Sequence, residues 1–366
     1  MFKFRDNIKA ITPYTPGKPV KEVERELGIR NSIKLASNEN AWGFSPKAKE
    51  AMEEAIKEAN IYPDGNSYYL RKEIAAFNNV HIDNVIAGNG SNEVLEIVMR
   101  TVLAKGCNVV SSQYAFAIYR LITEIADAEY RETKAKDHRF DAKAIMAACD
   151  QNTAIIVVDN PNNPTGTYIP FNEMLELLEF AEKNNILLIA DEAYWEYVRA
   201  KDYKSMMSVW GKYKNLVVSR TFSKVYGLCG LRIGYAIANE EVIKYANIVR
   251  EPFNVNLVAQ HAAIAAMEDQ TFVKDVVQKT HEGMDYLGKE LKAAGLNHLD
   301  SQCNFMLVEV PCDGKEFFNK LLKLGVIVRP MGGYGLNNFL RLTIGTTEQN
   351  KKAVEAIRQV LDDSRC

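Results

Sequence analysis

A hydroxyl-rich turn around one lysine is the segment of this 366-residue chain that most clearly predicts chemistry. The run Arg220-Thr221-Phe222-Ser223-Lys224 follows an apolar stretch, and Arg232 comes eight residues after the lysine. A lysine amine forms Schiff bases with aldehydes, and hydroxyl groups and a guanidinium bind phosphate well. This lysine turn (residues 220–232) therefore favours covalent binding of a phosphorylated aldehyde, whereas a lone lysine at a strand end is usually a solvated charge.

Two further motifs follow predicted strands and carry groups that suit the same ligand. The run Gly88–Glu93 opens a helix, so the backbone amides of Ser91 and Asn92 can bind a phosphate. The loop 159–166 contains two prolines that restrain Asn163, which can donate to a phenolate oxygen. The alternatives are an ordinary βα turn with a Ser or Asn cap and an ordinary Asn/Pro/Gly turn.

Acidic and basic residues in apolar surroundings supply the remaining candidates. Asp191 and Tyr194 follow the apolar strand predicted at 186–190, where a carboxylate is costly unless it meets a cation such as a protonated ring nitrogen. Glu192, beside Asp191, is expected to be a surface acid. Arg341 lies inside an apolar strand and requires an anionic partner, which is either a ligand or a structural carboxylate.

These motifs can form one site only in a fold that brings the ends of several strands together. Strands are predicted near 84–87, 108–111, 154–159, 186–190, 216–219 and 233–238, with helices near 92–104, 117–126, 142–148 and 172–183. Fully apolar strands suit a sheet that is covered on both faces, and the alternation of strands and helices predicts a mostly parallel α/β sheet. Ligands of such sheets bind outside the carboxyl ends of the strands, which is where the motifs fall.

The two ends of the chain predict a smaller α+β unit. The first forty residues form an irregular arm with one helix near 20–27, and a long helical stretch runs from 240 to about 294. Strands near 304–310 and 340–344 and helices near 314–324 and 349–362 follow. We expect an arm at 1–44 that joins the small domain, a large cofactor-binding domain at 45–265 and a small domain at 266–366.

Composition narrows the class of protein. The chain has 45 basic and 47 acidic residues, a net charge of -2 and 47% hydrophobic residues. It has no basic stripe for nucleic acid, no apolar run that would span a membrane and no signal-peptide core at its charged start. Six cysteines without a CxxC pair and five scattered histidines predict reduced thiols and no metal site. We expect a cytoplasmic protein.

The order of the motifs resembles that of fold-type I pyridoxal-phosphate aminotransferases of the class I/II superfamily. GNGSNE, NNPTG, DEAY, TFSK, GLRIG and LRLTIG occur in that order, and the similarity extends over nearly the whole chain. Within the superfamily, segments 11–18, 34–40 and 326–336 are similar to histidinol-phosphate aminotransferases. In one departure, Ala41-Trp42-Gly43 stands where that family usually has a proline, which brings an indole into a loop expected near the substrate.

The resemblance implies a role for each matching residue. Lys224 would be the Schiff-base lysine that also moves the proton, and Asp191 would pair with the pyridine nitrogen of the cofactor, pyridoxal 5'-phosphate. Asn163 and Tyr194 would bind its phenolic oxygen, and Phe116 would stack on its ring. The phosphate would be held by Ser91, Asn92, Thr221, Ser223 and Arg232.

The resemblance also implies the partners. Tyr62 would reach the cofactor phosphate of the neighbouring subunit, so a homodimer with shared active sites is expected. An amino donor, histidinol phosphate, and a 2-oxo acid, 2-oxoglutarate, would take turns at one site in the histidine-biosynthetic reaction. The substrate-binding residues would be Tyr14, Asn40, Arg329 and Arg341.

Three other readings remain open from the sequence. An aromatic amino-acid aminotransferase could use a ring pocket made of Tyr14, Trp42, Phe116, Tyr119 and Tyr334. A decarboxylase or an amine oxidase could use the same fold and cofactor. A binding protein that kept only the scaffold would not need the intact set of predicted cofactor residues.

The first prediction concerns Lys224. Lys224→Ala should lower turnover at least about 10³-fold, because the amine acts as proton carrier in every half-reaction. Initial rates of amino transfer measure this loss. Borohydride treatment of the cofactor-loaded protein should label residue 224 in the wild type, and a variant with near-wild-type rates would remove the mechanism.

Overall fold

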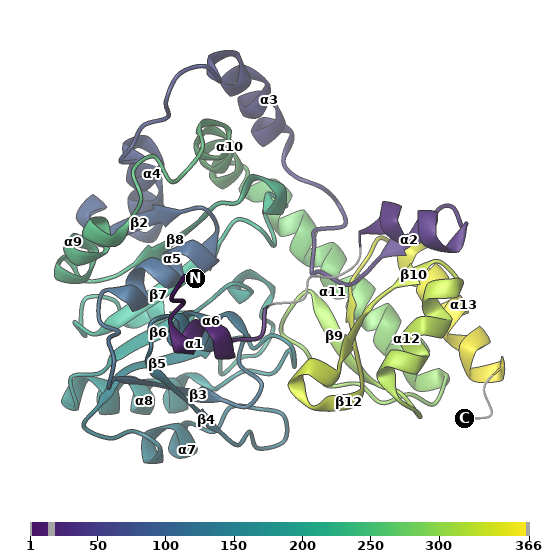
Figure 1. Ribbon diagram of the computed structural model, residues 1–366. Helices are drawn as coiled ribbons and strands as arrows, with labels where there is room; N and C mark the ends of the chain where they lie inside the picture. The colour runs from purple at the N-terminus through teal and green to yellow at the C-terminus, as the bar shows by residue number, and fades with distance from the viewer. Residues whose placement is uncertain (1, 14–18, 364–366) are drawn as a thin grey trace.

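A seven-stranded sheet forms the centre of the computed structural model, which describes residues 2–13 and 19–363 (Figure 1). The strands lie in the order β2-β8-β7-β6-β5-β3-β4. All neighbours are parallel except β8, which runs antiparallel to β2 and β7. The strands are β2 (Val85–Gly88), β3 (Asn108–Ser112), β4 (Glu129–Thr133), β5 (Thr153–Asp159), β6 (Leu187–Asp191), β7 (Leu216–Thr221) and β8 (Gly234–Ile237). The predicted mostly parallel α/β sheet is confirmed.

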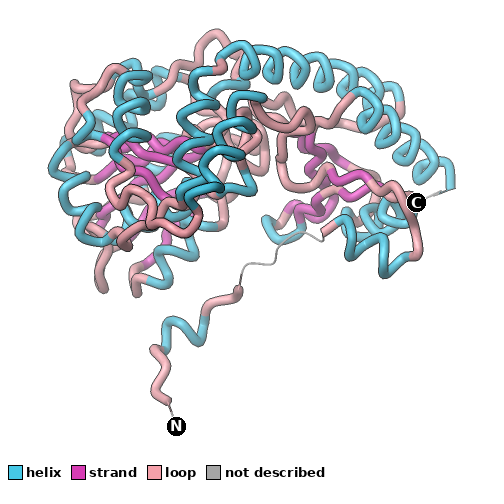
Figure 2. Tube along the Cα trace, turned by 90° about the horizontal axis from the view of Figure 1, so that it is seen from above, coloured by secondary structure: helices cyan, strands magenta, loops and turns pink. Residues whose placement is uncertain are grey.

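Helices lie on both sides of this sheet (Figure 2), which explains its apolar strands. Every residue of β2, β3, β6, β7 and β8 is buried. The flanking helices are α5 (Ser91–Arg100), α6 (Ile118–Ile125), α7 (Ala142–Ala147), α8 (Phe171–Lys183) and α9 (Glu240–Val249). The sequence did not predict β4, because this edge strand is only partly buried and its residues EYRET are not an apolar run.

A second, antiparallel sheet forms the part of the molecule drawn in yellow-green in Figure 1. It consists of β11 (Arg329–Met331), β12 (Leu336–Thr343) and β9 (Phe305–Glu309) and packs with α12 (Gly314–Lys323) and α13 (Thr347–Asp363). The N-terminal arm joins this part, because β1 (Ile33–Lys34) pairs with β10 (Val326–Ile327) and Leu35 belongs to its core.

The helices that follow β8 differ from the prediction. The predicted helical stretch from 240 to 294 is three helices, α9, α10 (Leu257–Glu268) and α11 (Gln270–Ala293). Pro252 lies in the first break, and Asn256 and Asp269 cap the helices that follow each break. The α-helices that precede β2 are α1 (Asp6–Ala10), α2 (Val20–Leu27), α3 (Pro46–Ala55) and α4 (Tyr68–Asn78).

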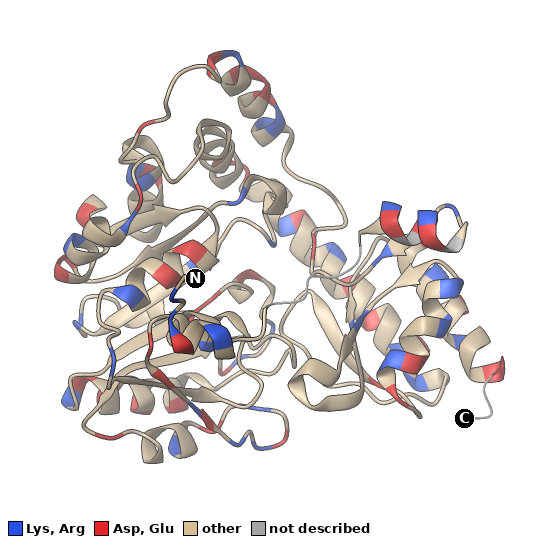
Figure 3. Ribbon diagram, in the orientation of Figure 1, with Lys and Arg blue, Asp and Glu red and all other residues tan. Residues whose placement is uncertain are grey.

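Charges of both signs lie along the same helices. Basic and acidic residues are interspersed over the helices visible in Figure 3. No helix among the described residues is long and apolar enough to cross a membrane. Within residues 2–13 and 19–363, no group of three or more His, Cys, Asp and Glu side chains is placed to hold a metal ion.

The expectation that Glu192 is a surface acid is wrong. Its side chain is 1% exposed and lies 2.8 Å from the guanidinium of Arg220, which is also buried. Ser205 and the Met206 amide donate to the same carboxylate, and the Arg220 guanidinium stacks 4.1 Å from the Trp195 ring centroid. The parallel pairing of β6 with β7 brings Glu192 and Arg220 together, which adjacency in the sequence could not indicate.

We expect the Glu192–Arg220 ion pair to contribute to the free energy of unfolding. Glu192→Ala should lower the free energy of unfolding by about 3 kcal/mol, because Arg220 would remain buried without its carboxylate. Urea denaturation measures the change. The double variant Glu192→Met/Arg220→Met, which removes both charges, should recover most of the loss, and a single variant that loses nothing would contradict the assignment.

Candidate functional site

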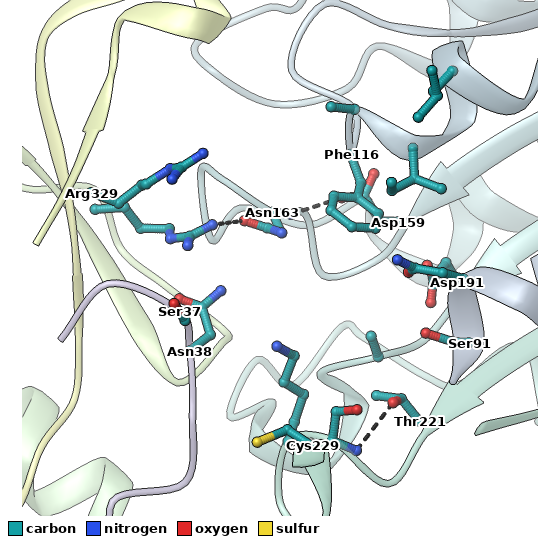
Figure 4. Close-up of a pocket in the computed structure, with 18 of the residues that line it drawn as sticks. Ser37, Asn38, Ser91, Phe116, Asp159, Asn163, Asp191, Thr221, Cys229 and Arg329 are labelled. Carbon is teal, nitrogen blue, oxygen red and sulfur yellow. Dashed lines mark hydrogen bonds between the residues drawn. The ribbon is translucent and has the colours of Figure 1, made fainter. Parts of the chain in front are cut away.

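A cavity of about 770 Å³, in the size range of cofactor sites, opens at the carboxyl ends of β5, β6 and β7 (Figure 4). Residues of the second sheet, including Arg329 and Arg341, form its opposite wall. The cavity brings together most residues predicted from the sequence: Ser91, Asn92, Phe116, Asn163, Asp191, Tyr194, Thr221, Ser223, Lys224, Arg232, Arg329 and Arg341.

Three predicted residues are not placed in this wall. Tyr14 lies outside the described residues. Asn40 does not line the cavity, because its amide donates to the Val225 carbonyl and accepts from the Trp42 amide. Tyr62 is 80% exposed and packs on Phe253, away from the cavity of its own chain. Its role toward a neighbouring subunit stays a prediction.

The amine of Lys224 is held among other cavity groups. Its Nζ lies 5.5 Å from the ring centroid of Tyr194. Burial, together with the positive charge of Arg341, lowers the pKa of Lys224 to about 8. An amine with this pKa is partly neutral at physiological pH, which is the form that attacks a carbonyl carbon.

Asp191 is buried with only one of its two oxygens satisfied. Oδ2 accepts a hydrogen bond of 2.8 Å from the hydroxyl of Tyr119, while Oδ1 has no hydrogen-bond partner among the described residues. Burial raises the pKa of Asp191 to about 6. A bare, buried carboxylate oxygen is costly, so Asp191 fits a site that receives a cationic donor from a ligand.

The antiparallel strand β8 begins against the start of α5, whose residues Ser91 and Asn92 line the cavity. The first residue of β8, Gly234, is paired with Gly88 and with Thr221, the last residues of the two neighbouring strands. A Cβ on Gly234 would lie 2.4 Å from the Ser91 amide nitrogen, so only glycine lets the helix start approach this closely.

The cavity has a positive character at the start of α5. Gly90 has φ +88°, and a Cβ there would lie 2.4 Å from Nη2 of Arg232. The amides at the start of α5 and the Arg232 guanidinium thus converge, with the side chains of Thr221 and Ser223 also lining the cavity. A helix start beside an arginine is a suitable phosphate site.

Hydrogen bonds join the two sheets across the cavity. Arg341 of β12 donates to the side-chain oxygen of Asn163 and, at 2.8 Å, to the Ala36 carbonyl. Asn38 donates to the Tyr194 hydroxyl at 2.8 Å. The predicted phenolate-binding pair, Asn163 and Tyr194, is therefore oriented by residues from the second sheet and the N-terminal arm.

The sequence did not indicate the contacts of three residues that shape the site. Tyr119 is a fully buried partner of Asp191 and does not line the cavity, contrary to its place in the predicted ring pocket. Asn38 orients Tyr194. Asp159 holds the loop by accepting from the side chain of Asn162 and the amide of Asn163. Their motifs were recognised, but no spacing rule indicated these contacts.

The indole of Trp42 does not enter the cavity. It packs against the hydrophobic cores of both the large and the small sheet. The next residue, Gly43, lies against the lysine turn, where a Cβ on Gly227 would meet the Gly43 carbonyl oxygen at 1.9 Å. Trp42 is therefore not among the residues that line the cavity, because the loop turns its side chain toward the cores.

These residues fit pyridoxal 5'-phosphate. Lys224 supplies an amine, Asp191 a bare buried oxygen for a ring nitrogen, and the start of α5 with Arg232 a cationic phosphate site. The strongest support for this fit is Oδ1 of Asp191, which has no hydrogen-bond partner among the described residues.

The low pKa of Lys224 predicts how the rate of cofactor uptake depends on pH. The rate at which the apo-protein takes up pyridoxal phosphate should rise with pH and level off above about 8, because the neutral amine is the nucleophile. Arg341→Gln should move the midpoint to higher pH, since it removes a positive neighbour. Stopped-flow absorbance measures the rate, with Arg329→Gln as control, and a pH-independent rate would contradict the prediction.

Comparison with known proteins shows the family of the chain. The model of the family "Aminotransferase class I and II" matches residues 30–357. The chain is 42% identical to histidinol-phosphate aminotransferase 2 of Carboxydothermus hydrogenoformans, covering 98% of this chain and 99% of the relative. It is 44% identical to histidinol-phosphate aminotransferase 1 of Dechloromonas aromatica, covering 97% of each.

Solved structures show the same fold. Histidinol-phosphate aminotransferase from Sinorhizobium meliloti, in complex with pyridoxal-5'-phosphate, aligns with a TM-score of 0.91 at 24% identity, over 99% of this chain and 98% of that chain. A Thermus thermophilus aspartate aminotransferase double mutant aligns with a TM-score of 0.85 at 23% identity, over 98% and 100%. The predicted fold and superfamily are confirmed: the chain belongs to the class I and II aminotransferases.

Proposed function

We propose that this protein is a pyridoxal-phosphate-dependent aminotransferase that moves the amino group of histidinol phosphate to 2-oxoglutarate in histidine biosynthesis. The observation that carries the cofactor assignment is the bare Oδ1 of Asp191 in the same cavity as the Lys224 amine. The names and full-length identity of the curated relatives support the substrate. Structural likeness does not select it, because aspartate aminotransferases share the fold.

Each end of the cofactor has a matching set of residues. Asp191 would hold the ring nitrogen, and Asn163 and Tyr194 would hold the phenolic oxygen. Phe116 lies in the cavity wall, where it would cover the ring. The phosphate would be bound by the start of α5 and the far end of the lysine turn: Ser91, Asn92, Thr221, Ser223 and Arg232.

When bound, the cofactor supplies an aldehyde that condenses with amines and a ring that accepts the electron pair of a broken C–H bond. Lys224 would hold the cofactor through its amine, and the same amine would move the proton at the substrate carbon. Its amine suits this task, because burial lowers its pKa to about 8, close to physiological pH. Asp191 keeps the ring nitrogen protonated, which strengthens its pull on electrons.

The opposite wall would bind the substrates. Two unlike anions, a phosphate monoester and a dicarboxylate, have to use one site in turn. Arg329 and Arg341 are the cationic side chains that the second sheet contributes to the cavity, and guanidinium groups bind both phosphate and carboxylate. We assign them to these anionic groups.

The closest rival is an aromatic amino-acid aminotransferase. Of the aromatic residues that would line its ring pocket, Phe116 and Tyr334 line the cavity, whereas Trp42 and Tyr119 do not. Among the described residues, the aromatic lining is therefore smaller than the sequence suggested, and Tyr14, the fifth member of that set, lies outside them.

Half-reactions test the substrate directly. Purified holoenzyme should convert its bound aldehyde form to the amine form faster with histidinol phosphate than with phenylalanine, as followed by absorbance. The reverse order would replace the proposed substrate. Release of carbon dioxide or peroxide would indicate decarboxylase or oxidase chemistry, and a protein without a cofactor absorbance band would be a binding protein.

We further propose that two chains form a homodimer. Within each chain we propose an arm at 1–44, a large domain at 45–265 and a small domain at 266–366. Two pairs of exposed aromatic side chains, Tyr62 with Phe253 and Tyr68 with Tyr69, support an association of chains through this part of the molecule. The five described cysteines are free thiols, which supports the proposed cytoplasmic location.

A mixing experiment tests the shared site. Tyr62→Ala and Lys224→Ala chains should each have low activity, but refolding them together should restore about a quarter of the wild-type rate per site. This follows because half of the chains enter hybrid dimers, and each hybrid holds one site with both native residues. No recovery in a mixture that sediments as a dimer would show that Tyr62 does not act across the interface.

A further inference from the structure

Tyr119 is a buried residue whose hydroxyl is hydrogen-bonded to the Asp191 carboxylate. It lies on α6, is 0% exposed and donates a 2.8 Å hydrogen bond to Oδ2 of Asp191. Its neighbours Ile118, Arg120 and Leu121 line the cavity, but Tyr119 does not. It therefore touches neither cofactor nor substrate, and any effect on the reaction has to pass through Asp191.

The hydrogen bond determines how Asp191 meets a ligand. A carboxylate is planar, so the oxygen that accepts from Tyr119 also orients the other oxygen. That other oxygen, Oδ1, is buried and has no partner among the described residues. The Tyr119 hydroxyl also stabilises the ionised form, and it counteracts the burial that raises the pKa of Asp191 to about 6.

The other charged groups around Asp191 do not replace this donor. Asp159, its partner in the β5–β6 register, is itself a buried acid whose pKa is raised by burial to about 8, so it is mostly protonated at neutral pH. Glu192 is paired with Arg220. Lys224 favours a negative Asp191 by its charge, but this is the weakest of the influences on the Asp191 pKa, and the Lys224 amine would itself be engaged by the cofactor.

We propose that Tyr119 is a positioning residue: it directs Oδ1 of Asp191 to the ring nitrogen of the cofactor and keeps this carboxylate weakly basic. A less basic carboxylate leaves the shared proton on the ring nitrogen, where it strengthens electron withdrawal. This inference rests on the proposed function, because it assumes a pyridine ring in the cavity.

Two ligands that differ only at the ring nitrogen test this proposal. Pyridoxal phosphate and its 1-deaza analogue, in which carbon replaces the ring nitrogen, are titrated into apo-protein of wild type and Tyr119→Phe. The variant should bind pyridoxal phosphate about 10-fold more weakly, the effect of one hydrogen bond to a charged group. Its affinity for the analogue should stay within about twofold of wild type, because the coupling to the nitrogen is absent.

A structural role for the hydroxyl would give a different result. If Tyr119→Phe weakens both ligands equally, or neither, the positioning role is overturned. Tyr235→Phe is the matched control, because it removes another buried tyrosine hydroxyl, on β8 and outside the cavity wall. The control should bind both ligands like the wild type, and thermal unfolding of all three proteins shows whether they are folded.

The reaction provides a second readout. Tyr119→Phe should lower kcat about 10-fold and leave KM within about twofold, because the residue does not touch the substrate. An unchanged kcat would count against the proposal. If wild-type protein fails to bind pyridoxal phosphate, the proposed function fails; if it binds normally and Tyr119→Phe retains the wild-type preference between the two ligands, only this inference fails.

Discussion

Asp191 carries a carboxylate into the interior of the protein at the end of β6, where it is 3% exposed. Burial of a carboxylate is unfavourable unless donors or a cation compensate for lost water. Among the described residues, the hydroxyl of Tyr119 donates to one oxygen and the other oxygen has no hydrogen-bond partner. A positively charged ring nitrogen would complete this interaction, and most of the other residues proposed to bind the cofactor line the same cavity.

The direction of the strands explains why those groups meet. Strands β5, β6 and β7 are parallel neighbours, so their carboxyl ends deliver Asp159, Asp191 and Thr221 to one edge of the sheet. Strand β8 runs the other way and begins where β2 and β7 end. It thereby brings the helix start at Ser91 beside the lysine turn, although the two segments are more than a hundred residues apart in the sequence.

The second sheet is part of the same site. Arg341 of β12 contacts Asn163, and Asn38 of the N-terminal arm contacts Tyr194, so both sheets orient the residues proposed to bind the phenolic oxygen. The positive charge of Arg341 also contributes to the low pKa of Lys224. An arginine that would bind substrate therefore also acts on the nucleophile, and the position of the small sheet is coupled to the chemistry at the large one.

The sequence alone was sufficient to predict the fold class, the family and a set of site residues most of which line the cavity, because these depend on local patterns. Apolar strands, glycine turns and the motifs around Lys224, Asp191 and Asn163 each lie within a few residues. Contacts between distant segments required the tertiary structure. The Tyr119–Asp191 hydrogen bond, the Glu192–Arg220 ion pair and the inward packing of Trp42 all join residues that only the pairing of strands and the packing of the cores bring together. Burial, which decides the charge and partners of a side chain, is a property of the folded chain and cannot be read from a short motif.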